Sequence, residues 1–308
     1  MKYSIVIPVF NEEDNVETLY KDLIFEMDKI NLEYEIIFVN DGSSDNTLNN
    51  LKKLSLIKII NLRKNFGQTA ALDAGIKEAK GEIIITLDGD GQNPPCEIPK
   101  LLKKIDQGYD LVSGWRYKRK DPLAKIIISK GAYIMRALLV KDGIHDSGCT
   151  LKAYRKECVK NLDLYGEMHR FIPAILKWKG FRVSEVKVDH RERRFGKTNY
   201  NSKRIIKGFL DMWMVWFWRK YSARPLHLFG SLGVLIGGGG FILGFYLAVA
   251  RLLGKISLQN SIWPLVSIFM ILVGLQLFIS GILADIAIKT YYNKKKVNYY
   301  VEEVIKNE

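Results

Sequence analysis

Cysteine and histidine are scarce in this chain of 308 residues, which has three of the former and four of the latter. Cys96, Cys149 and Cys158 form no CxxC pair, so the sequence indicates neither a disulfide scaffold nor a thiolate metal site and fits a reducing compartment. The histidines are scattered, which argues against zinc. No repeat or low-complexity segment is evident. The N-terminus enters a strand pattern directly, so we expect no cleavable signal peptide.

Charged side chains are missing from two long stretches near the C-terminus. Residues 226–250 contain only His227 near their start, and residues 262–284 contain no ionisable side chain. Each stretch exceeds the roughly 20 residues that cross a bilayer core. Two buried core helices are the alternative, but such helices rarely run uncharged for so long. The sequence therefore predicts two transmembrane helices, at about 226–250 and 262–288, joined by a short loop.

The positive charge flanks these spans unevenly. Lys and Arg are dense before the first span and after the second, whereas the loop at 251–261 has only Arg251 and Lys255. The positive-inside rule then predicts a multi-pass protein of the cell membrane with its N-terminal domain and its tail (289–308) in the cytoplasm. The net charge of +14 could indicate nucleic acid. Beside a membrane hairpin, anionic lipid and phosphorylated substrates explain it better, so we expect no nucleic-acid partner.

Residues 1–200 alternate strand and helix patterns. This alternation predicts an α/β domain with a mostly parallel sheet covered by helices on both faces. Strands are expected at 3–9, 34–39, 58–62, 82–87 and 111–113, and helices at 15–30, 46–54 and 69–79. Two basic, aromatic-rich segments, 123–140 and 205–221, are typical of helices lying in the headgroup region, with packing against the domain core as the alternative. The second forms most of a juxtamembrane segment at 201–225.

Two carboxylates end the most apolar strand of this domain. The run from Ile83 to Leu87 stops at Asp88, and Asp90 follows two residues later. Open α/β sheets bind their ligands at the carboxyl ends of the strands. Mg²⁺ and Mn²⁺ prefer such oxygen ligands and commonly bind one or two carboxylates together with substrate phosphates. The pattern therefore predicts a divalent cation held on a diphosphate.

Two neighbouring strands also end in polar residues. Asn11 and Glu12 follow the first strand, and Asp41 follows the second. Ser44 and Asp45 are explained by capping of the next helix. The carboxylate of Asp41 could instead accept an N–H group of a nucleobase. We expect these strand ends to converge with Asp88 on one edge of the sheet.

With these motifs the chain resembles glycosyltransferase family 2, which has the GT-A fold. Within that family it is similar to the polyprenyl-phosphate glycosyltransferases, such as dolichyl-phosphate mannose synthase and bactoprenol glucosyltransferase. The resemblance covers nearly the whole chain, hairpin included. The motifs that carry it are Pro8-Val9-Phe10-Asn11-Glu12, Asn40-Asp41-Gly42-Ser43-Ser44-Asp45, Asp88-Gly89-Asp90-Gly91-Gln92-Asn93-Pro94-Pro95, Gly114-Trp115-Arg116 and Arg194-Phe195-Gly196-Lys197-Thr198.

The resemblance implies roles for the strand-end residues. Asp88 and Asp90 match the family's DxD motif, and Gln92 would complete the site for Mg²⁺ or Mn²⁺. The residues implied to bind the nucleotide-sugar are Pro8, Phe10, Glu12, Asp41, Asp88 and Gly89.

A second set is implied to bind phosphates of the donor and of the lipid acceptor. Its members are Arg116, Lys125, Ser129, Arg191, Arg194 and Thr198. Lys125 stands where the family has an arginine, so the charge is kept without the bidentate geometry. Thr198 and Asn199 stand where the family commonly has Ser-Lys. The basic run from Arg191 to Thr198 is predicted to close over the donor, although a solvated charge run is the ordinary alternative.

Asp146 completes the implied catalytic set of Asp88, Asp90, Asp146 and Arg116. It would act as a general base, or position a basic group, or only cap a turn. A lipid phosphate monoester has a second pKa of about 6, so it is already ionised at neutral pH and hardly needs a base. We therefore favour positioning.

The implied reaction is an inverting, metal-dependent transfer of a sugar from a nucleotide-sugar, in particular a UDP-sugar such as UDP-glucose, to undecaprenyl or dolichyl phosphate. One alternative is transfer to a glycolipid hydroxyl or a polysaccharide, although the Gln-x-x-Arg-Trp motif of processive synthases is missing. Another is a non-catalytic membrane scaffold. The glycine run 237–240 predicts close helix packing and a possible homo-oligomer. Asp285, at the end of the second span, has no assigned role.

Overall fold

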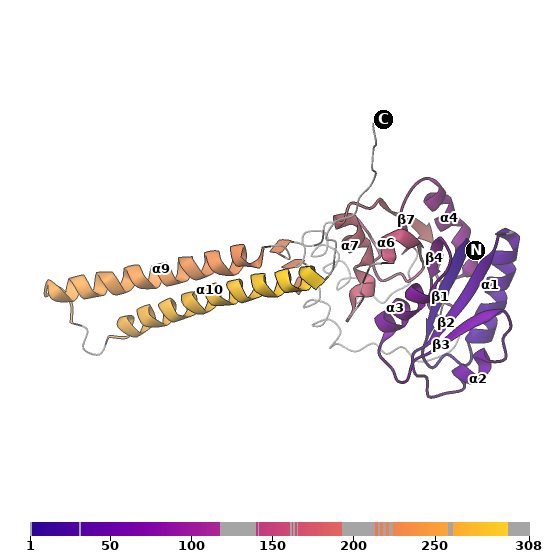
Figure 1. Ribbon diagram of the computed structural model, residues 1–308, viewed down its shortest axis with the longest axis horizontal. Coiled ribbons are helices and arrows are strands. Elements are labelled where there is room, and N and C mark those ends of the chain that lie inside the picture. Colours follow the sequence, from indigo (N-terminus) through magenta and orange to yellow (C-terminus); the bar gives the residue numbers. More distant parts are fainter. Residues whose placement is uncertain are drawn as a thin grey trace. The chain divides into compact units, whose positions relative to one another are not determined.

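The computed structural model describes residues 2–117 except 31, residues 140–192 except 141, 161, 163 and 165, six positions between 213 and 221, and residues 224–294 except 258–260. The chain forms two compact units, residues 1–213 and 214–308 (Figure 1). Of the two predicted headgroup segments, 123–140 lies outside the described residues except for 140, and 205–221 is described at only those six positions; the tail beyond Lys294 also lies outside them.

The first unit is built on a seven-stranded sheet whose strand order is β3-β2-β1-β4-β6-β5-β7. Only β6 runs antiparallel to its neighbours, β4 and β5, so the prediction of a mostly parallel sheet is confirmed. The strands are β1 (Tyr3–Val9), β2 (Tyr34–Asn40), β3 (Ile57–Asn61), β4 (Ile83–Thr86), β5 (Leu111–Arg116), β6 (Lys152–Arg155) and β7 (Val183–Val188).

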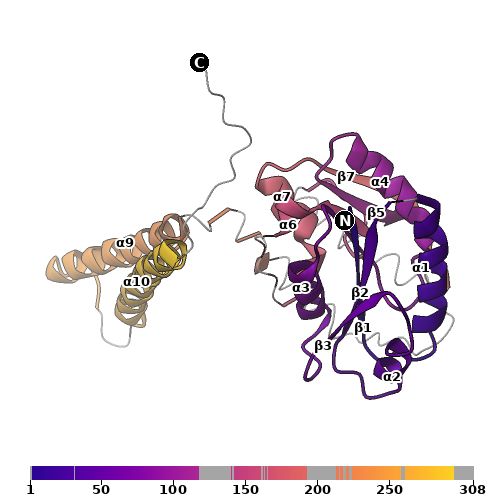
Figure 2. The same cartoon turned by 45° about the vertical axis from the view of Figure 1, so that its right-hand side comes forward.

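Helices cover both faces of this sheet (Figure 2). Each central strand is an apolar run because both of its faces are buried, as in β1, where all seven residues are inaccessible. One face packs against α1 (Val16–Ile30), α2 (Thr47–Leu51) and α4 (Ile98–Asp106), which follows the short 3-10 helix η1 (Pro95–Glu97). The other packs against α3 (Gln68–Glu78), α6 (Lys156–Val159), η2 (Met168–Arg170) and α7 (Ile172–Trp178).

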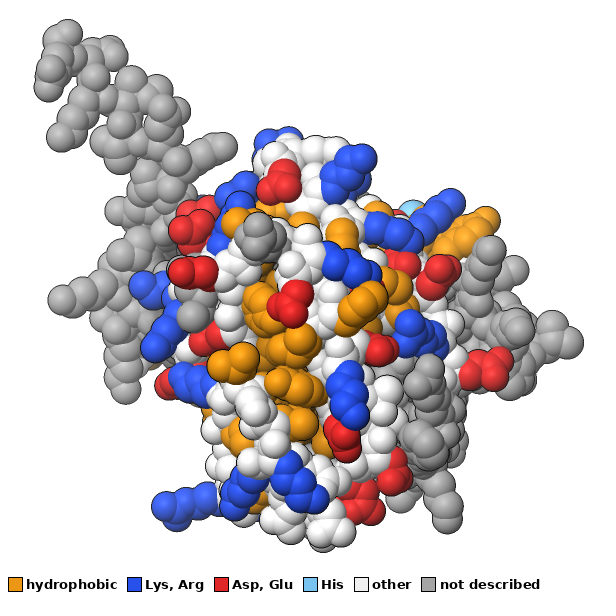
Figure 3. All heavy atoms as spheres, turned by 90° about the vertical axis from the view of Figure 1, so that its right-hand side faces the viewer, with side chains coloured by type: hydrophobic (Ala, Val, Ile, Leu, Met, Phe, Trp, Pro, Cys, Tyr) orange, Lys and Arg blue, Asp and Glu red, His pale blue; other side chains and the backbone are white. Residues whose placement is uncertain are grey.

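Basic and acidic side chains are interspersed on the face of this unit drawn in Figure 3, with hydrophobic side chains between them. The net charge of +14 is therefore not gathered into one basic patch on this face.

The second unit contains α9 (Pro225–Leu252) and α10 (Trp263–Lys294). Both helices are long and apolar enough to cross a membrane, and only 17% of each apolar window is buried within the chain. Core helices of a soluble protein would bury far more of this surface, so the hairpin predicted at 226–250 and 262–288 agrees with the structure. The second helix runs beyond the predicted boundary, and Asp285 forms an ion pair of 2.7 Å with Lys289 one turn further along it.

Glycines allow α9 and α10 to pack with their backbones in contact. A Cβ placed on Gly274 would lie 2.5 Å from the Cα of Gly237 and 2.6 Å from the carbonyl oxygen of Gly233. Ser267 lies one heptad earlier and donates a hydrogen bond of 2.8 Å to the carbonyl of Gly240. The glycine run that predicted close packing is thus used within the hairpin.

Substitution of Gly274 by alanine is expected to separate the two helices, because the new methyl group would overlap backbone atoms that cannot rotate away. We expect a loss of about 1–3 kcal/mol, the usual cost of overpacking. The measurement is unfolding of the full chain in mixed micelles as the fraction of dodecyl sulfate rises. Gly238→Ala is the matched control, since nothing lies within 4 Å of a Cβ there. Equal destabilisation by both variants would contradict the packing.

Candidate active site

The carboxyl ends of β1, β2, β4 and β5 and the start of antiparallel β6 lie on one edge of the sheet. The polar segments that follow β1, β2 and β4 in the sequence therefore lie at this edge. Asp88 follows β4, and its Oδ1 accepts a hydrogen bond of 2.6 Å from Nε2 of Gln68 at the start of α3. Asp90 is 8% exposed and accepts the backbone N–H of Gln92 at 3.1 Å. The acidic turn is therefore held in shape by its own backbone and by a neighbouring helix.

Gly89 pins this turn against the end of β1. A Cβ there would lie 2.5 Å from Cγ1 of Val9 and 3.2 Å from the carbonyl oxygen of Pro8. Only glycine lets the acidic turn cross the first strand so closely. The contact also explains why Pro8 and Gly89 belong to one site although 80 residues separate them in sequence.

Burial and the charge of Asp90 raise the pKa of Asp88 to about 6, despite opposing effects of Thr150, Arg116 and Lys152. Two carboxylates that repel each other in a buried turn are stabilised by a cation between them. Their oxygens suit Mg²⁺ or Mn²⁺. Among the described residues, no group of three or more His, Cys, Asp and Glu could hold a metal. A metal at this turn would take its remaining ligands from substrate phosphates, water or an amide such as that of Gln92, which stays a prediction.

The side chain of Gln92 lies beside the segment after β7. The side-chain Nε2 of Gln92 donates to the backbone carbonyl of Arg191 at 3.4 Å, and the backbone carbonyl of Gln92 accepts the N–H of Arg191 at 2.9 Å. The guanidinium of Arg191 pairs with Asp22 on α1 at 3.0 Å. A phosphate-binding role for Arg191 stays a prediction that requires this exposed pair to open.

The loops after β1 and β2 are joined to each other by hydrogen bonds. Asn11 has a φ of 54° and accepts the N–H of Ser44 at 2.9 Å through its side chain. The N–H of Glu12 bonds Oγ1 of Thr47, and its carboxylate accepts Nδ2 of Asn15 at 2.6 Å. Glu12 therefore fixes the start of α1 in this structure. Phe10, 42% exposed, presents its ring at the same edge.

Asp41 has two backbone partners that the sequence did not reveal. Its carboxylate accepts the N–H groups of Phe66 and Gly67 at 2.8 and 2.9 Å, and the residue is only 3% exposed. The adjacent Gly42 lets the 63–67 loop approach, since a Cβ there would lie 2.4 Å from the carbonyl carbon of Lys64. Each carboxylate oxygen keeps a further lone pair, so contact with a nucleobase stays a prediction.

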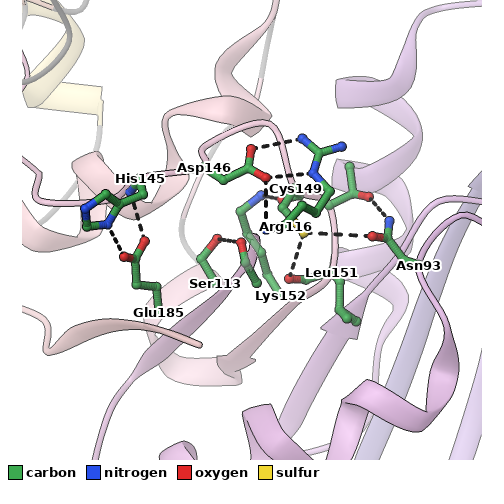
Figure 4. Close-up of polar contacts among 11 residues, drawn as sticks. Asn93, Ser113, Arg116, His145, Asp146, Cys149, Leu151, Lys152 and Glu185 are labelled. Carbon is green, nitrogen blue, oxygen red and sulfur yellow. Dashed lines mark hydrogen bonds and ion pairs between the residues drawn. The ribbon is translucent and has the colours of Figure 1, made fainter. Parts of the chain in front are cut away.

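Arg116, at the end of β5, and Asp146 form a bidentate ion pair (Figure 4). Nε and NH2 of Arg116 donate at 2.6 and 2.9 Å to the two carboxylate oxygens. The side chains are 12% and 17% exposed. Burial alone would raise the pKa of Asp146, but the hydrogen bonds and charge of Arg116 outweigh it and hold that pKa below its ordinary value. The pair therefore favours the ionised form of Asp146 beside the guanidinium, and its role in positioning Arg116 stays a prediction.

The sequence did not predict the contacts of His145 that hold the loop carrying Asp146 in place. His145 bonds Glu185 on β7 through both its backbone N–H (2.9 Å) and Nδ1, and its ring stacks on Trp115 with the centroids 4.3 Å apart (Figure 4). These contacts anchor the loop that carries Asp146. The only feature of the sequence that could have indicated these contacts is Trp115, the aromatic residue next to Arg116.

Lys152, at the start of β6, was missed as well. It is 2% exposed and donates to the carbonyl of Cys149, and burial lowers its pKa to about 8 although neighbouring anions oppose the shift. Nearby, Nδ2 of Asn93 donates to Oγ1 of Thr150 at 3.1 Å and ties the loop after the acidic turn to β6. Four of the predicted phosphate-binding residues, Lys125, Ser129, Arg194 and Thr198, lie outside the described residues.

The sheet with its acidic turn and facing arginine defines a GT-A glycosyltransferase. The sequence model of the family described as "Glycosyl transferase family 2" matches residues 4–163, about half of the chain. The protein belongs to glycosyltransferase family 2, and it is an enzyme of that kind, as the sequence predicted.

Its curated relatives match over almost the full length. The chain is 36% identical to dodecaprenyl-phosphate galacturonate synthase of Rhizobium johnstonii, across 99% of this chain and 93% of the relative. It is 32% identical to undecaprenyl-phosphate 4-deoxy-4-formamido-L-arabinose transferase of Proteus mirabilis, across 99% and 94%.

Among solved structures, the fold is similar to that of glucosyl-3-phosphoglycerate synthase from Mycobacterium tuberculosis. The complex of that enzyme with uridine diphosphate aligns with a TM-score of 0.55 at 17% identity, over 71% of this chain and 79% of that chain. Its complex with Mn²⁺ and UDP-glucose aligns with a TM-score of 0.54 at 18% identity, over 71% and 78%. At this identity the likeness establishes the GT-A fold.

Proposed function

We propose that this protein transfers a sugar from a nucleotide-sugar, specifically a UDP-sugar, to the phosphate of a polyprenyl phosphate at the cytoplasmic face of the cell membrane. The main observation behind this proposal is that one edge of the sheet holds both the buried acidic turn of Asp88 and Asp90 and the Arg116–Asp146 ion pair. The full-length likeness to relatives named for dodecaprenyl and undecaprenyl phosphate supports the acceptor, and the apolar hairpin supports the location.

The chain's own residues divide the work in this proposal. A divalent cation, when bound, offsets the charge that develops on the leaving diphosphate. Asp88 and Asp90 hold that cation, with Gln92 as a further oxygen ligand. Phe10 and Asp41 line the nucleoside site between β1 and β2, with Pro8 and Glu12 shaping its wall. Arg116, aimed by Asp146, binds a phosphate oxygen through its remaining N–H groups.

The acceptor oxygen attacks the anomeric carbon on the side opposite the diphosphate, so the configuration inverts. It forms the new C–O bond while the bond to the diphosphate breaks, and no proton needs to be removed from an ionised phosphate. The proposed division of the chain is a catalytic domain at 1–200, a juxtamembrane segment at 201–225, the hairpin at 226–288 and a cytoplasmic tail at 289–308.

The test is incorporation of label into lipid by the full chain in proteoliposomes. Radiolabelled UDP-sugars, a hexose and a hexuronic acid among them, are supplied with Mg²⁺, Mn²⁺ or EDTA. The acceptor is undecaprenyl phosphate, and the free polyprenol serves as its matched control. We expect labelled lipid only with the phosphate and a metal. Labelling of the free polyprenol would favour a hydroxyl acceptor, and no labelling with any donor would overturn the proposal.

Replacement of Asp146 by asparagine separates positioning from base catalysis. Because the pKa of Asp146 lies below its usual range and both of its oxygens bind Arg116, we expect a partial loss of about 10–100-fold, as for residues that orient a binding group. The measurement is kcat/KM between pH 5 and 9. The shape of the profile should not change. Loss of all measurable activity, or a residual rate whose profile lacks one limb, would identify Asp146 as the base.

A further inference from the structure

The apolar span of α10, Trp263–Thr290, contains one side-chain amide, Gln276, near its middle. It lies 13 residues after Trp263 and 14 before Thr290, the limits of the span. Its side chain is exposed on the hairpin. The two serines of this helix differ: Ser267 bonds the carbonyl of Gly240, and Ser280 bonds the backbone carbonyl of Gln276, both at 2.8 Å. Within the described residues no polar group meets the amide of Gln276.

Gln276 lies on the face of α10 that is turned away from α9. The seam with α9 is formed by Ser267, Gly274 and Gly281, spaced by seven residues. Gln276 follows Gly274 by two residues, which corresponds to a rotation of about 200° around an α-helix and places it on the opposite side from the seam. Exposed apolar side chains share the face of Gln276 at spacings of three and four: Phe269 (66% exposed), Leu272 (57%), Ile279 (42%) and Leu283 (61%). We call these four residues and Gln276 the outer face of α10.

An amide on this face would have no hydrogen-bonding partner in a bilayer. Hydrocarbon offers no donors or acceptors, so the side chain gains by meeting a polar group on another helix. The alternation of three and four is the spacing at which two helices interlock their side chains. A single polar residue within such a pattern also fixes the register of the pairing helices.

We infer that two copies of this chain associate in the membrane through the outer face of α10, with their Gln276 side chains hydrogen-bonded to each other. A second copy fits because a two-fold axis brings the same residue opposite itself. A primary amide, with both a donor and an acceptor, is its own complement. Gly237 and Gly240 of the glycine run 237–240 already face the backbone of α10, so in this structure they pack within the hairpin.

The experiment measures energy transfer between donor- and acceptor-labelled full-length chains in liposomes, at several protein-to-lipid ratios. Gln276→Leu keeps the size and the apolar face but removes the amide. We expect its association constant to fall about tenfold, the effect of losing two interhelical hydrogen bonds of moderate strength in lipid. Gln276→Asn keeps an amide and should retain most of the association. A wild-type chain that stays monomeric at all ratios, or an unchanged constant for Gln276→Leu, overturns the inference.

Cysteine cross-linking maps the face independently. Phe269→Cys and Leu283→Cys lie on the outer face, one on each side of Gln276 along the helix, whereas the similarly exposed Leu275→Cys lies about 80–120° around the helix from them. Each is made in a Cys96→Ser background, because Cys96 is exposed. Oxidation should produce dimers from the first two at least fivefold faster than from the third. Equal rates at all three positions would contradict the proposed face, even if the chain is a dimer.

Discussion

Replacing Asp88 by asparagine is expected to lower kcat by at least about three orders of magnitude, because the variant loses a proposed metal ligand and, with it, the proposed stabilisation of the leaving diphosphate. Asparagine keeps the shape and can still accept the hydrogen bond from Gln68, so the loss would report the charge. Transfer of label to polyprenyl phosphate is the measurement. Glu17→Gln is the matched control, an acid-to-amide change in an exposed ion pair with Lys21, and should leave the rate unchanged.

The same substitution is expected to stabilise the protein when metal is removed. Burial and Asp90 raise the folded-state pKa of Asp88 from 3.8 to about 6, so the folded state binds this proton more tightly than the unfolded one. In EDTA, stability therefore falls as the pH rises from about 4 through 6, and Asp88→Asn removes that loss. At pH 7.5 we expect an increase in Tm of about 2–4 °C, which corresponds to roughly 1 kcal/mol.

Asp88→Asn is therefore expected to lower activity and to raise the stability of the metal-free protein. This combination is diagnostic of a charged residue that destabilises the fold but is required for function. If Asp88 had only a structural role, its substitution would lower both the stability and the activity of the protein. If Asp88→Asn unfolds more easily than the wild type in EDTA, repulsion between Asp88 and Asp90 does not destabilise the metal-free protein, and this inference is wrong. If its activity is preserved, the cation is held elsewhere.

The sequence predicted the parts of this protein that depend on local pattern. The strand from Ile83 to Thr86 is recognisable because both of its faces are buried, and parallel strands place their polar ends on one edge whatever their order. The hairpin follows from two uncharged runs long enough for a bilayer. These features need no knowledge of distant contacts.

Contacts between distant segments could not be predicted in this way. Strand β6 has only four residues, and Lys152 and Arg155 interrupt any apolar pattern, so nothing local marks it as the antiparallel strand between β4 and β5. The bonds from Phe66 and Gly67 to Asp41 depend on how a loop folds back over 25 residues. Likewise, the period of the glycines in α9 indicates close packing but does not identify the helix that packs there.

Removal of Arg116 is expected to damage both activity and stability, and the two effects can be separated. Arg116→Ala leaves the buried carboxylate of Asp146 without its partner, which typically costs about 3–5 kcal/mol. It also removes the guanidinium proposed to bind a phosphate, so we expect a fall in kcat/KM of at least about 100-fold. Chemical denaturation and lipid labelling measure the two quantities. Arg170→Ala, which breaks an exposed pair with Glu167, is the control and should change neither.

The double variant Arg116→Ala/Asp146→Ala decides between the two effects. With both charges gone, no buried ion is left unpaired, so most of the lost stability should return. Activity should not return, because the guanidinium proposed to bind the phosphate is still missing. The coupling energy in stability would therefore be large and the coupling in kcat/KM small. If activity recovers along with stability, Arg116 serves only to neutralise Asp146, and the phosphate is bound by the basic residues of 118–139 and 193–200.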